Sequence, residues 1–222
     1  MIVEDKSINQ LLTDGVKEFN LVLSNEKVEK LLKYKEMLIE WNKKINLTAI
    51  EDDKEVIIKH YVDSLSIFPY IKKESRSLID IGTGAGFPGI PLKIALDNLN
   101  ITLMDSLEKR VNFLNEVIGE LNLKGIKAVH GRAEEYGKNK EYREQYDVSV
   151  ARAVANLPVL LEYCIPFVKK GGIFIAMKGS TIDEVEHSDK ALQTLGGKIE
   201  SINNITLPFS DIKRNIIITK KL

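Results

Sequence analysis

From residue 77 onward the chain alternates short apolar runs with stretches of helical periodicity, and this pattern constrains the fold more than any other feature. Runs of four or five residues rich in Ile, Val and Leu are typical of buried strands. Strict alternation of strand and helix favours a mostly parallel, doubly wound α/β sheet that binds ligands at the carboxyl ends of its strands. We predict seven strands, at residues 78–81, 101–104, 126–130, 148–151, 173–177, 202–206 and 216–219.

Helices are predicted between these strands and ahead of them. Apolar positions recur every three or four residues between 24 and 45, which indicates one buried stripe, with Ser24 as the N-cap. The last predicted helix starts with a capping box formed by Thr181 and Glu184. The remaining helices are expected at residues 54–70, 88–96, 107–121, 157–168 and 182–195.

Length and composition limit the other possibilities. A chain of 222 residues suits one α/β domain, predicted at 73–222, with a helical extension at 1–72 packed on it. No apolar run could cross a bilayer and no secretory signal is visible, so we expect a cytoplasmic protein, and a monomer. The lone Cys164 and three scattered histidines predict no metal. Lys plus Arg and Asp plus Glu are both 32, which counts only weakly against RNA, because phosphate contacts depend on local charge.

A glycine-rich segment at 80–89 lies between the first predicted strand and the next helix. It fits two patterns. Counted from Gly84 it matches the dinucleotide pattern G-x-G-x-x-G, ending at Gly89. Counted from Asp80 it matches the acidic-x-G-x-G-x-G pattern of S-adenosylmethionine enzymes. We favour the second pattern because the strand ends at its first glycine and because a carboxylate suits a cationic ligand. The predicted cofactor residues are then Asp80, Gly82, Gly84 and Gly86.

Further candidates follow the next three strands. Asp105, with Ser106 beside it, ends the second strand nineteen residues after Gly86, where an acid can bind ribose hydroxyls. After the third strand, Glu134 could accept a hydrogen bond from adenine, or could simply complement a helix N-terminus. Arg152 ends the fourth strand, where it could touch ligand or substrate, or could pair with an Asp of the protein.

Several segments together resemble one family. Residues 80–92, with their two prolines, resemble the bacterial 16S rRNA guanine-N7 methyltransferases, also called glucose-inhibited division protein B. Residues 41–48, 60–65, 131–135 and 150–155 point the same way. The likeness implies a Rossmann-like class I fold, S-adenosylmethionine as cofactor and small-subunit ribosomal RNA as partner. It places cofactor contacts on Gly82, Phe87, Ala133, Glu134 and Arg152. Lys59 departs from the family, which often has Arg there.

The chemistry implied by the resemblance needs little catalytic machinery. Guanine N7 carries a lone pair and no proton, so alignment suffices and no general base is required. Cys164 lies in an apolar helical run, which disfavours catalysis through a cysteine adduct. We therefore expect Arg152 and Lys178 to be the catalytic cations, with Lys178 gripping a phosphate. Other possible phosphate contacts are Lys109, Arg110, Lys169, Lys170, Lys213 and Arg214.

Three alternatives and one local question stay open at this point. An NAD-dependent oxidoreductase would use the Gly84 pattern, a non-catalytic RNA-associated module would bind the cofactor only, and a small-molecule methyltransferase would use another acceptor. His60 and Asp63 are expected to form a hydrogen-bonded pair that closes a helix onto the core, with a structural or substrate-docking role.

Overall fold

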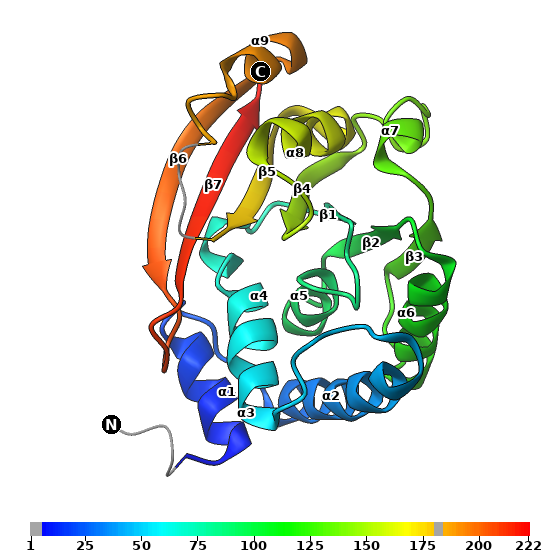
Figure 1. The fold of residues 1–222 in the computed structure, drawn as a ribbon, viewed down its shortest axis with the longest axis vertical. Coiled ribbons are helices and arrows are strands. Elements are labelled where there is room, and N and C mark those ends of the chain that lie inside the picture. Colours follow the sequence, from blue (N-terminus) through cyan, green and yellow to red (C-terminus); the bar gives the residue numbers. More distant parts are fainter. Residues whose placement is uncertain (1–5, 180–183) are drawn as a thin grey trace.

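The computed structural model describes residues 6–179 and 184–222. Within them, seven strands form one sheet in the order β3-β2-β1-β4-β5-β7-β6 (Figure 1). Strands β1 to β5 run parallel, whereas β7 is antiparallel to both β5 and β6. Each predicted strand lies within an observed one, so the doubly wound prediction is confirmed. The bounds are β1 Ser77–Ile81, β2 Asn100–Asp105, β3 Ile126–His130, β4 Tyr146–Arg152, β5 Val168–Lys178, β6 Gly197–Thr206 and β7 Lys213–Lys221.

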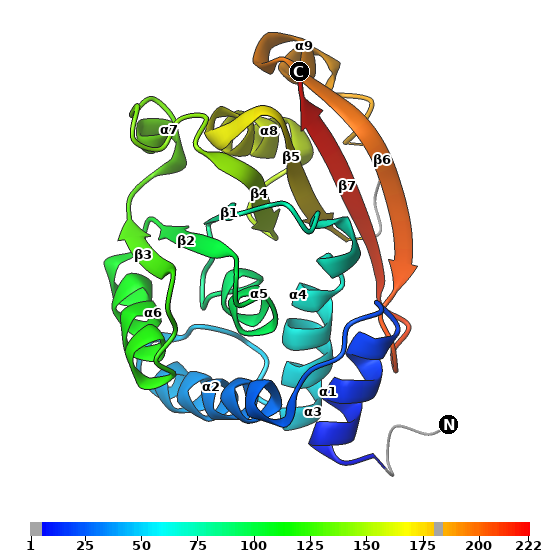
Figure 2. The ribbon, with the colours of Figure 1, turned by 180° about the vertical axis from the view of Figure 1, so that it is seen from behind.

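Helices cover both faces of the sheet. Figures 1 and 2 show the helices up to α6 on one side, and α8 and α9 on the other, with the short α7 beside α8. In the described residues, no helix is both long enough and apolar enough to span a bilayer. The bounds are α1 Ile8–Lys17, α2 Asn25–Ile45, α3 Asp53–Val56, α4 Asp63–Leu65, α5 Gly89–Ala95, α6 Glu108–Glu120, α7 Ala133–Tyr136, α8 Leu157–Cys164 and α9 Asp189–Leu195.

The helix predicted at 54–70 is in fact composite. Asp52 caps α3 by accepting from the Glu55 amide at 2.9 Å. A π-helical segment, η2 Ile57–Val62, then joins α3 to α4, and a short 3₁₀ helix, η3 Phe68–Tyr70, follows. Helical periodicity in the sequence predicts the presence of this helix but cannot reveal a change from α to π hydrogen bonding.

Two other helix predictions are wrong at their ends. The helix predicted at 157–168 stops at Cys164 and continues only as a 3₁₀ turn, η4 Ile165–Phe167. The helix predicted at 182–195 appears in the described residues only from Asp189. Of its expected capping box, Thr181 lies outside the described residues, and the Glu184 carboxylate accepts instead from the Leu157 amide at 2.7 Å.

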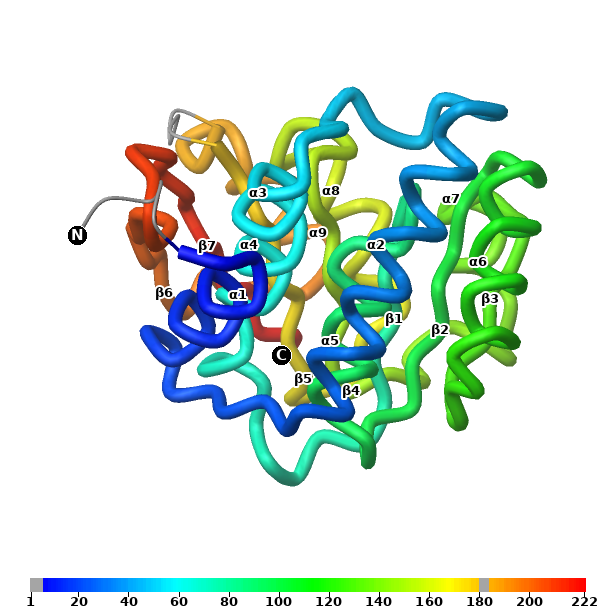
Figure 3. Tube along the Cα trace, turned by 90° about the horizontal axis from the view of Figure 1, so that it is seen from below, coloured from blue at the N-terminus to red at the C-terminus, as the bar shows by residue number. Residues whose placement is uncertain are grey.

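The apolar core has two parts, one on each face of the sheet. Because side chains alternate along a strand, Leu78 joins the core under the first six helices while Ile79 joins the core under α8. The first of these cores also contains Leu11 and Leu31, so α1 and α2 share it with the sheet; Figure 3 shows these helices beside the strands. This shared core is what positions the N-terminal helices against the glycine-rich loop.

Candidate functional site

The loop between β1 and α5 folds over the carboxyl end of β2. The amides of Gly82 and Thr83 both donate to the Met104 carbonyl, at 2.9 and 3.1 Å. Gly82 has φ of +66°, and a Cβ there would lie 2.8 Å from a methyl group of Val154. A residue with a side chain would therefore be strained and would also collide. The loop is built for close approach to the main chain at this point.

A cavity of about 250 Å³ opens beside this loop, where β1, β2 and β3 end. Five of the predicted cofactor residues line it: Gly82, Asp105, Ser106, Ala133 and Glu134. Its remaining walls are formed by Ile81, Met104, Gly131, Arg132, Val154 and Tyr163. Residues from three separate strand ends thus converge on one hollow, which is the arrangement expected for a ligand site in a parallel α/β sheet.

Asp105 is fixed at the bottom of this cavity and is only 3% exposed. Its carboxylate accepts from the amides of Leu107 and Gly84, both at 2.9 Å, and from Arg110 at 3.4 Å. A carboxylate offers about four acceptor positions, so one remains for a ligand hydroxyl. The amide of Gly84, which we predicted to bind the cofactor, is used to orient Asp105.

Asp80 lies under the loop rather than among the residues that line the cavity. Its Oδ2 accepts from the Thr83 hydroxyl at 2.6 Å and from the Gly89 amide at 2.8 Å. Its Oδ1 has no hydrogen-bond partner among the described residues. Burial of the carboxyl raises the pKa of Asp80 to about 6. The contacts of Asp80 hold the first turn of α5 against the end of β1.

Gly86 and Phe87 face α2 and the π-helical segment. A Cβ on Gly86, whose φ is +100°, would lie 2.8 Å from the Tyr34 hydroxyl. That hydroxyl donates to the Ala85 carbonyl. Phe87 is 4% exposed and stacks on the His60 ring at a centroid distance of 4.4 Å. The loop is therefore held by the N-terminal helices, which makes them part of the site.

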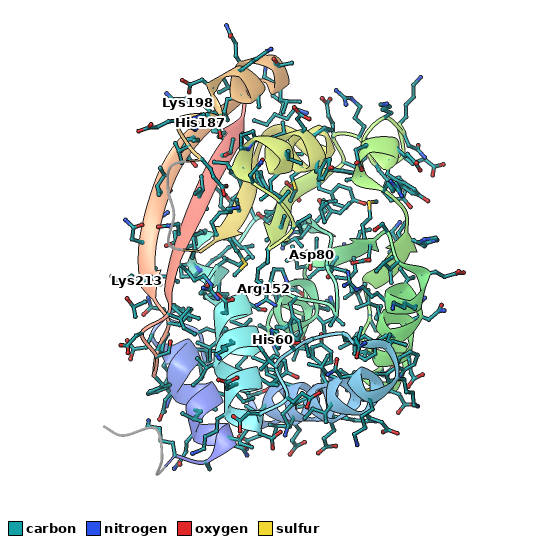
Figure 4. The ribbon with its side chains drawn as sticks, viewed as in Figure 1. His60, Asp80, Arg152, His187, Lys198 and Lys213 are labelled. Atoms are coloured by element: carbon teal, nitrogen blue, oxygen red, sulfur yellow. The ribbon has the colours of Figure 1, made fainter. Side chains whose placement is uncertain are left out.

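Arg152 ends β4 and is held by three groups of the π-helical region. Its Nη1 donates to the Lys59 carbonyl and to the Asp63 carboxylate, both at 3.0 Å, and its Nη2 donates to His60 Nδ1 at 3.2 Å. The guanidinium also lies over the Phe87 ring, 5.1 Å from its centroid. Figure 4 shows Arg152 between Asp80 and His60. Asp63 is the partner carboxylate that the sequence left as an alternative for Arg152.

The π-helical turn explains why the Lys59 carbonyl is available. In an α-helix the Asp63 amide would donate to it, but here that amide donates to the carbonyls of Ile58 and His60. The predicted His60–Asp63 pair is not direct, since Arg152 lies between the two residues. Asp63 also accepts from Arg214 at 3.0 and 3.3 Å. One carboxylate, 1% exposed, thus joins two guanidinium groups.

His60 is neutral in this arrangement. Arginine can only donate, so His60 Nδ1 is the acceptor and the proton resides on Nε2, which donates to the Thr48 hydroxyl at 2.9 Å. Burial, reinforced by the positive charges of Arg152 and Lys59, lowers the pKa of His60 to about 3. The imidazole is therefore a fixed acceptor for Arg152 at neutral pH.

The predicted phosphate contacts lie at opposite ends of the strands, some at the amino ends and others at the carboxyl ends. Lys178 ends β5 and pairs with Glu184 at 2.9 Å, while it donates to the Ala155 carbonyl at 2.7 Å. It thereby ties down the loop that follows β4. Lys169 and Lys170 lie at the start of the same strand, at the edge away from the cavity. Arg214, at the start of the antiparallel β7, returns to the cavity edge, since Asn215 pairs with Lys178.

Cysteine and metal chemistry receive no support from the described residues. Cys164 is fully buried, and burial raises the pKa of its thiol well above 9. A buried neutral thiol is a poor nucleophile, as the sequence predicted. No group of three or more His, Cys, Asp or Glu residues within 6–179 and 184–222 could hold a metal ion.

Comparison of the sequence with known proteins identifies one family. The family model described as GidB, rRNA small subunit methyltransferase G, matches residues 27–217. A relative from Acetivibrio thermocellus with the name ribosomal RNA small subunit methyltransferase G is 60% identical, over 98% of this chain and 90% of the relative. A relative of the same name from Clostridium botulinum (strain Kyoto / Type A2) is 53% identical, over 96% of this chain and 90% of the relative.

Solved structures agree on the fold. A SAM-dependent methyltransferase from Aquifex aeolicus aligns with a TM-score of 0.56 and 16% identity, over 78% of this chain and 96% of that one. TYW2 of M. jannaschii, solved in complex with AdoMet, aligns with a TM-score of 0.54 and 14% identity, over 69% and 72%. These matches do not favour an oxidoreductase. The chain has the class I methyltransferase fold and belongs to the GidB family of small-subunit rRNA methyltransferases.

Proposed function

We propose that this enzyme transfers the methyl group of S-adenosylmethionine to N7 of a guanine in 16S ribosomal RNA. The observation that carries the proposal is the convergence of five predicted cofactor residues on one cavity, in a chain of the GidB family. We further propose that it acts in the cytoplasm, in keeping with its lone, buried cysteine, and that it is a monomer.

The cavity residues suit the parts of this methyl donor. The remaining acceptor position of Asp105 matches the ribose hydroxyls, and Glu134, at the far wall, matches the amino group of adenine. At Gly82 the main chain of the loop borders the cavity and packs closely against Val154, and we expect the methionine portion of the donor to lie against this main chain. When bound, the donor supplies an electrophilic methyl group on a positively charged sulfur.

We expect Arg152, which ends β4 but is not among the residues that line the cavity, to contact the donor or the guanine. A guanidinium has five N–H donors, of which the Lys59 carbonyl, Asp63 and His60 use three. Two donors remain for a carboxylate of the methyl donor or for O6 of guanine, an oxygen that arginine commonly recognises. Held by fixed partners, Arg152 can orient its target without a loss of side-chain freedom at the moment of reaction.

The described residues supply positioning rather than acid–base chemistry. Guanine N7 attacks with its own lone pair and no proton has to leave. Asp80 and His60 both lie near Arg152, yet each is bound internally, Asp80 to Thr83 and Gly89 and His60 to Thr48. We infer that both hold the scaffold around the reacting groups. The base itself must leave its stack to reach the cavity edge.

Transfer of a labelled methyl group tests this proposal directly. The protein is incubated with S-adenosylmethionine carrying a labelled methyl group and with small ribosomal subunits from cells that lack the enzyme, and the RNA is then mapped by mass spectrometry. We expect one 7-methylguanine in 16S RNA, strongly reduced for Arg152→Ala and unchanged for Lys190→Ala, an exposed cation on α9. No incorporation, or a methyl group on another atom, refutes the proposal.

A further inference from the structure

Two neighbouring hollows lie at the amino ends of the strands, the end of the sheet opposite the donor cavity. The larger, of about 670 Å³, lies between η3, the start of β1 and the loop after α5. The smaller, of about 280 Å³, lies between the start of β1 and the start of β5. Lys72 and Ser75 line both, so the two hollows adjoin, and we call them together the far-edge groove. No residue of the donor cavity lines it.

The far-edge groove is positively charged, although the whole chain carries no net charge. Six cations line it against three carboxylates: Lys27, Lys72, Lys73, Arg76, Lys169 and Lys170, and Glu74, Asp97 and Asp147. Two of the cations are neutralised, Lys27 by Asp97 at 2.8 Å and Lys169 by Asp147 at 3.2 Å. The clustering of cations at one edge is the kind of local charge that the balanced totals of the sequence hide.

Four cations remain available to a ligand. Within the residues that the structure describes, Lys72, Lys73, Arg76 and Lys170 make no ion pair with a carboxylate. The three from the segment before β1 are exposed. Asp147 cannot neutralise them fully, because its carboxylate already accepts from the amides of Arg76 and Ser77 at 2.8 and 2.9 Å. Glu74 is the one carboxylate of the lining that forms no ion pair among the described residues, so a polyanion along this edge would meet four unpaired positive charges and one unpaired negative charge.

The larger hollow adds an apolar wall beside these charges. Phe68, Pro69, Ile71, Ala95, Leu96 and Leu99 line it. Its volume falls in the range of about 300–1,000 Å³ typical of small-ligand sites. An apolar wall next to cations suits a nucleotide, whose base packs on the wall while its phosphate faces the charges. The ligand class indicated is therefore a phosphodiester chain with at least one unstacked base.

We propose that the far-edge groove is a second RNA-binding site, which holds single-stranded RNA through its phosphates while the donor cavity acts on a base elsewhere. The proposal rests on the proposed function in one respect, that RNA is the natural polyanion for this chain. The groove lies at the amino ends of β1 and β5, whereas Arg152 and Lys178 lie at carboxyl ends. The length of a strand thus separates two regions of contact with one large RNA.

The test compares wild type with two variants in equilibrium RNA binding. A fluorescent single-stranded RNA of twelve nucleotides is titrated with the full chain, in excess adenosylhomocysteine, at several salt concentrations. The test variant is Lys72→Ala/Lys73→Ala/Arg76→Ala. The matched control is Lys138→Ala/Lys140→Ala/Lys190→Ala, which removes the same charge from exposed positions outside the groove. Unchanged adenosylhomocysteine affinity verifies that each variant is folded.

Loss of three phosphate contacts should lower the slope of log affinity against log salt by about 2, since each contact on a single strand contributes about 0.7. When the salt is raised from 50 to 200 mM, the fold-loss of affinity should therefore be roughly 20 times smaller for the test variant than for wild type. The control should keep the wild-type slope. A test variant with the wild-type slope, or a control that changes as much, overturns the inference.

Two further measurements separate this inference from the proposed function. If wild type methylates small-subunit RNA but the test variant keeps the wild-type salt slope, only the far-edge groove is refuted. If wild type binds adenosylhomocysteine and shows the groove-dependent slope but methylates no RNA, only the proposed function fails. A guanosine monophosphate competitor that displaces the RNA from wild type but not from the test variant supports the apolar wall as the place of one base.

Discussion

The substitution Asp63→Asn tests whether one buried negative charge holds the guanidinium groups of Arg152 and Arg214 in place. It keeps the shape of the side chain and removes the charge that Arg152 and Arg214 share. The carboxylate is 1% exposed, and the two arginine side chains are 14% and 24% exposed. The variant therefore leaves two positive groups close together with little water and no counter-charge.

The expected cost in stability follows from these exposures. Removal of one partner from a buried ion pair costs about 3–5 kcal/mol. Both arginines retain some access to water and the asparagine oxygen still accepts one hydrogen bond, so we expect the lower end, about 3 kcal/mol. For a chain of this length, the melting temperature should fall by roughly 6–12 °C.

The same change should reduce turnover well below what instability explains. A shift of about 1 Å in a positioning group can cost about a hundredfold in rate. We expect kcat for methyl transfer to fall about a hundredfold in Asp63→Asn, measured 15 °C below its own melting temperature so that the protein is folded. Glu200→Gln, which removes an exposed charge on β6, should change neither kcat nor stability.

A double-mutant cycle tests whether Asp63 affects kcat through Arg152. If Asp63 acts through Arg152, then Arg152→Ala should cost much less in the Asp63→Asn background than in wild type. If Arg152→Ala lowers kcat by the same factor in both backgrounds, Asp63 has no part in positioning Arg152. A kcat that stays at the wild-type value in folded Asp63→Asn would refute the positioning role outright.

Three other predictions can be checked with standard assays. The unfolded chain takes up a proton near pH 6.5 that folded His60 refuses until about pH 3, so the contribution of His60 to stability should be lost as the pH drops through this window. Buried Asp80, with its pKa raised to about 6, works in the opposite direction, so the contribution of His60 is read from the difference between two proteins: in urea unfolding, His60→Gln should lose less stability than wild type as the pH drops. Gly82→Val should abolish adenosylhomocysteine binding in calorimetry while Val154→Ala retains it, and normal affinity in Gly82→Val would remove this glycine from the site. Cys164→Ala should keep kcat within about twofold and cost about 1–2 kcal/mol of stability, and a complete loss of activity in the folded variant would indicate thiol chemistry.

The strands and the donor cavity were the most predictable parts. Strand positions follow from short apolar runs, and in a parallel sheet the residues that end neighbouring strands must meet at one edge. This reasoning alone predicts that Gly82, Asp105 and Glu134 lie together. Tyr163 was not predicted because it lies near the C-terminal end of a helix, α8, rather than at the end of a strand, and so carries no positional signal of that kind.

The cluster around Arg152 was not predictable in its detail. The partners of Arg152 come from residues 59–63, and Asp63 in turn accepts from Arg214; only the packing of the N-terminal helices against the sheet brings these residues together. The sequence gives His60 and Asp63 three positions apart, which suggests a direct contact on a regular helix. The π-helical turn breaks that regularity and lets a guanidinium from another element pass between them.

The order of the strands has a consequence for biosynthesis. β7 is inserted between β5 and β6, although the ribosome makes it after both. Until β7 is in place, β6 has no neighbour in the sheet and Asp63 lacks Arg214, a residue 151 positions away. A growing chain therefore contains all the residues of its donor cavity well before Asp63 can pair with both Arg152 and Arg214. The complete charge cluster beside the cavity forms only when β7, the last strand to be made, is inserted into the sheet.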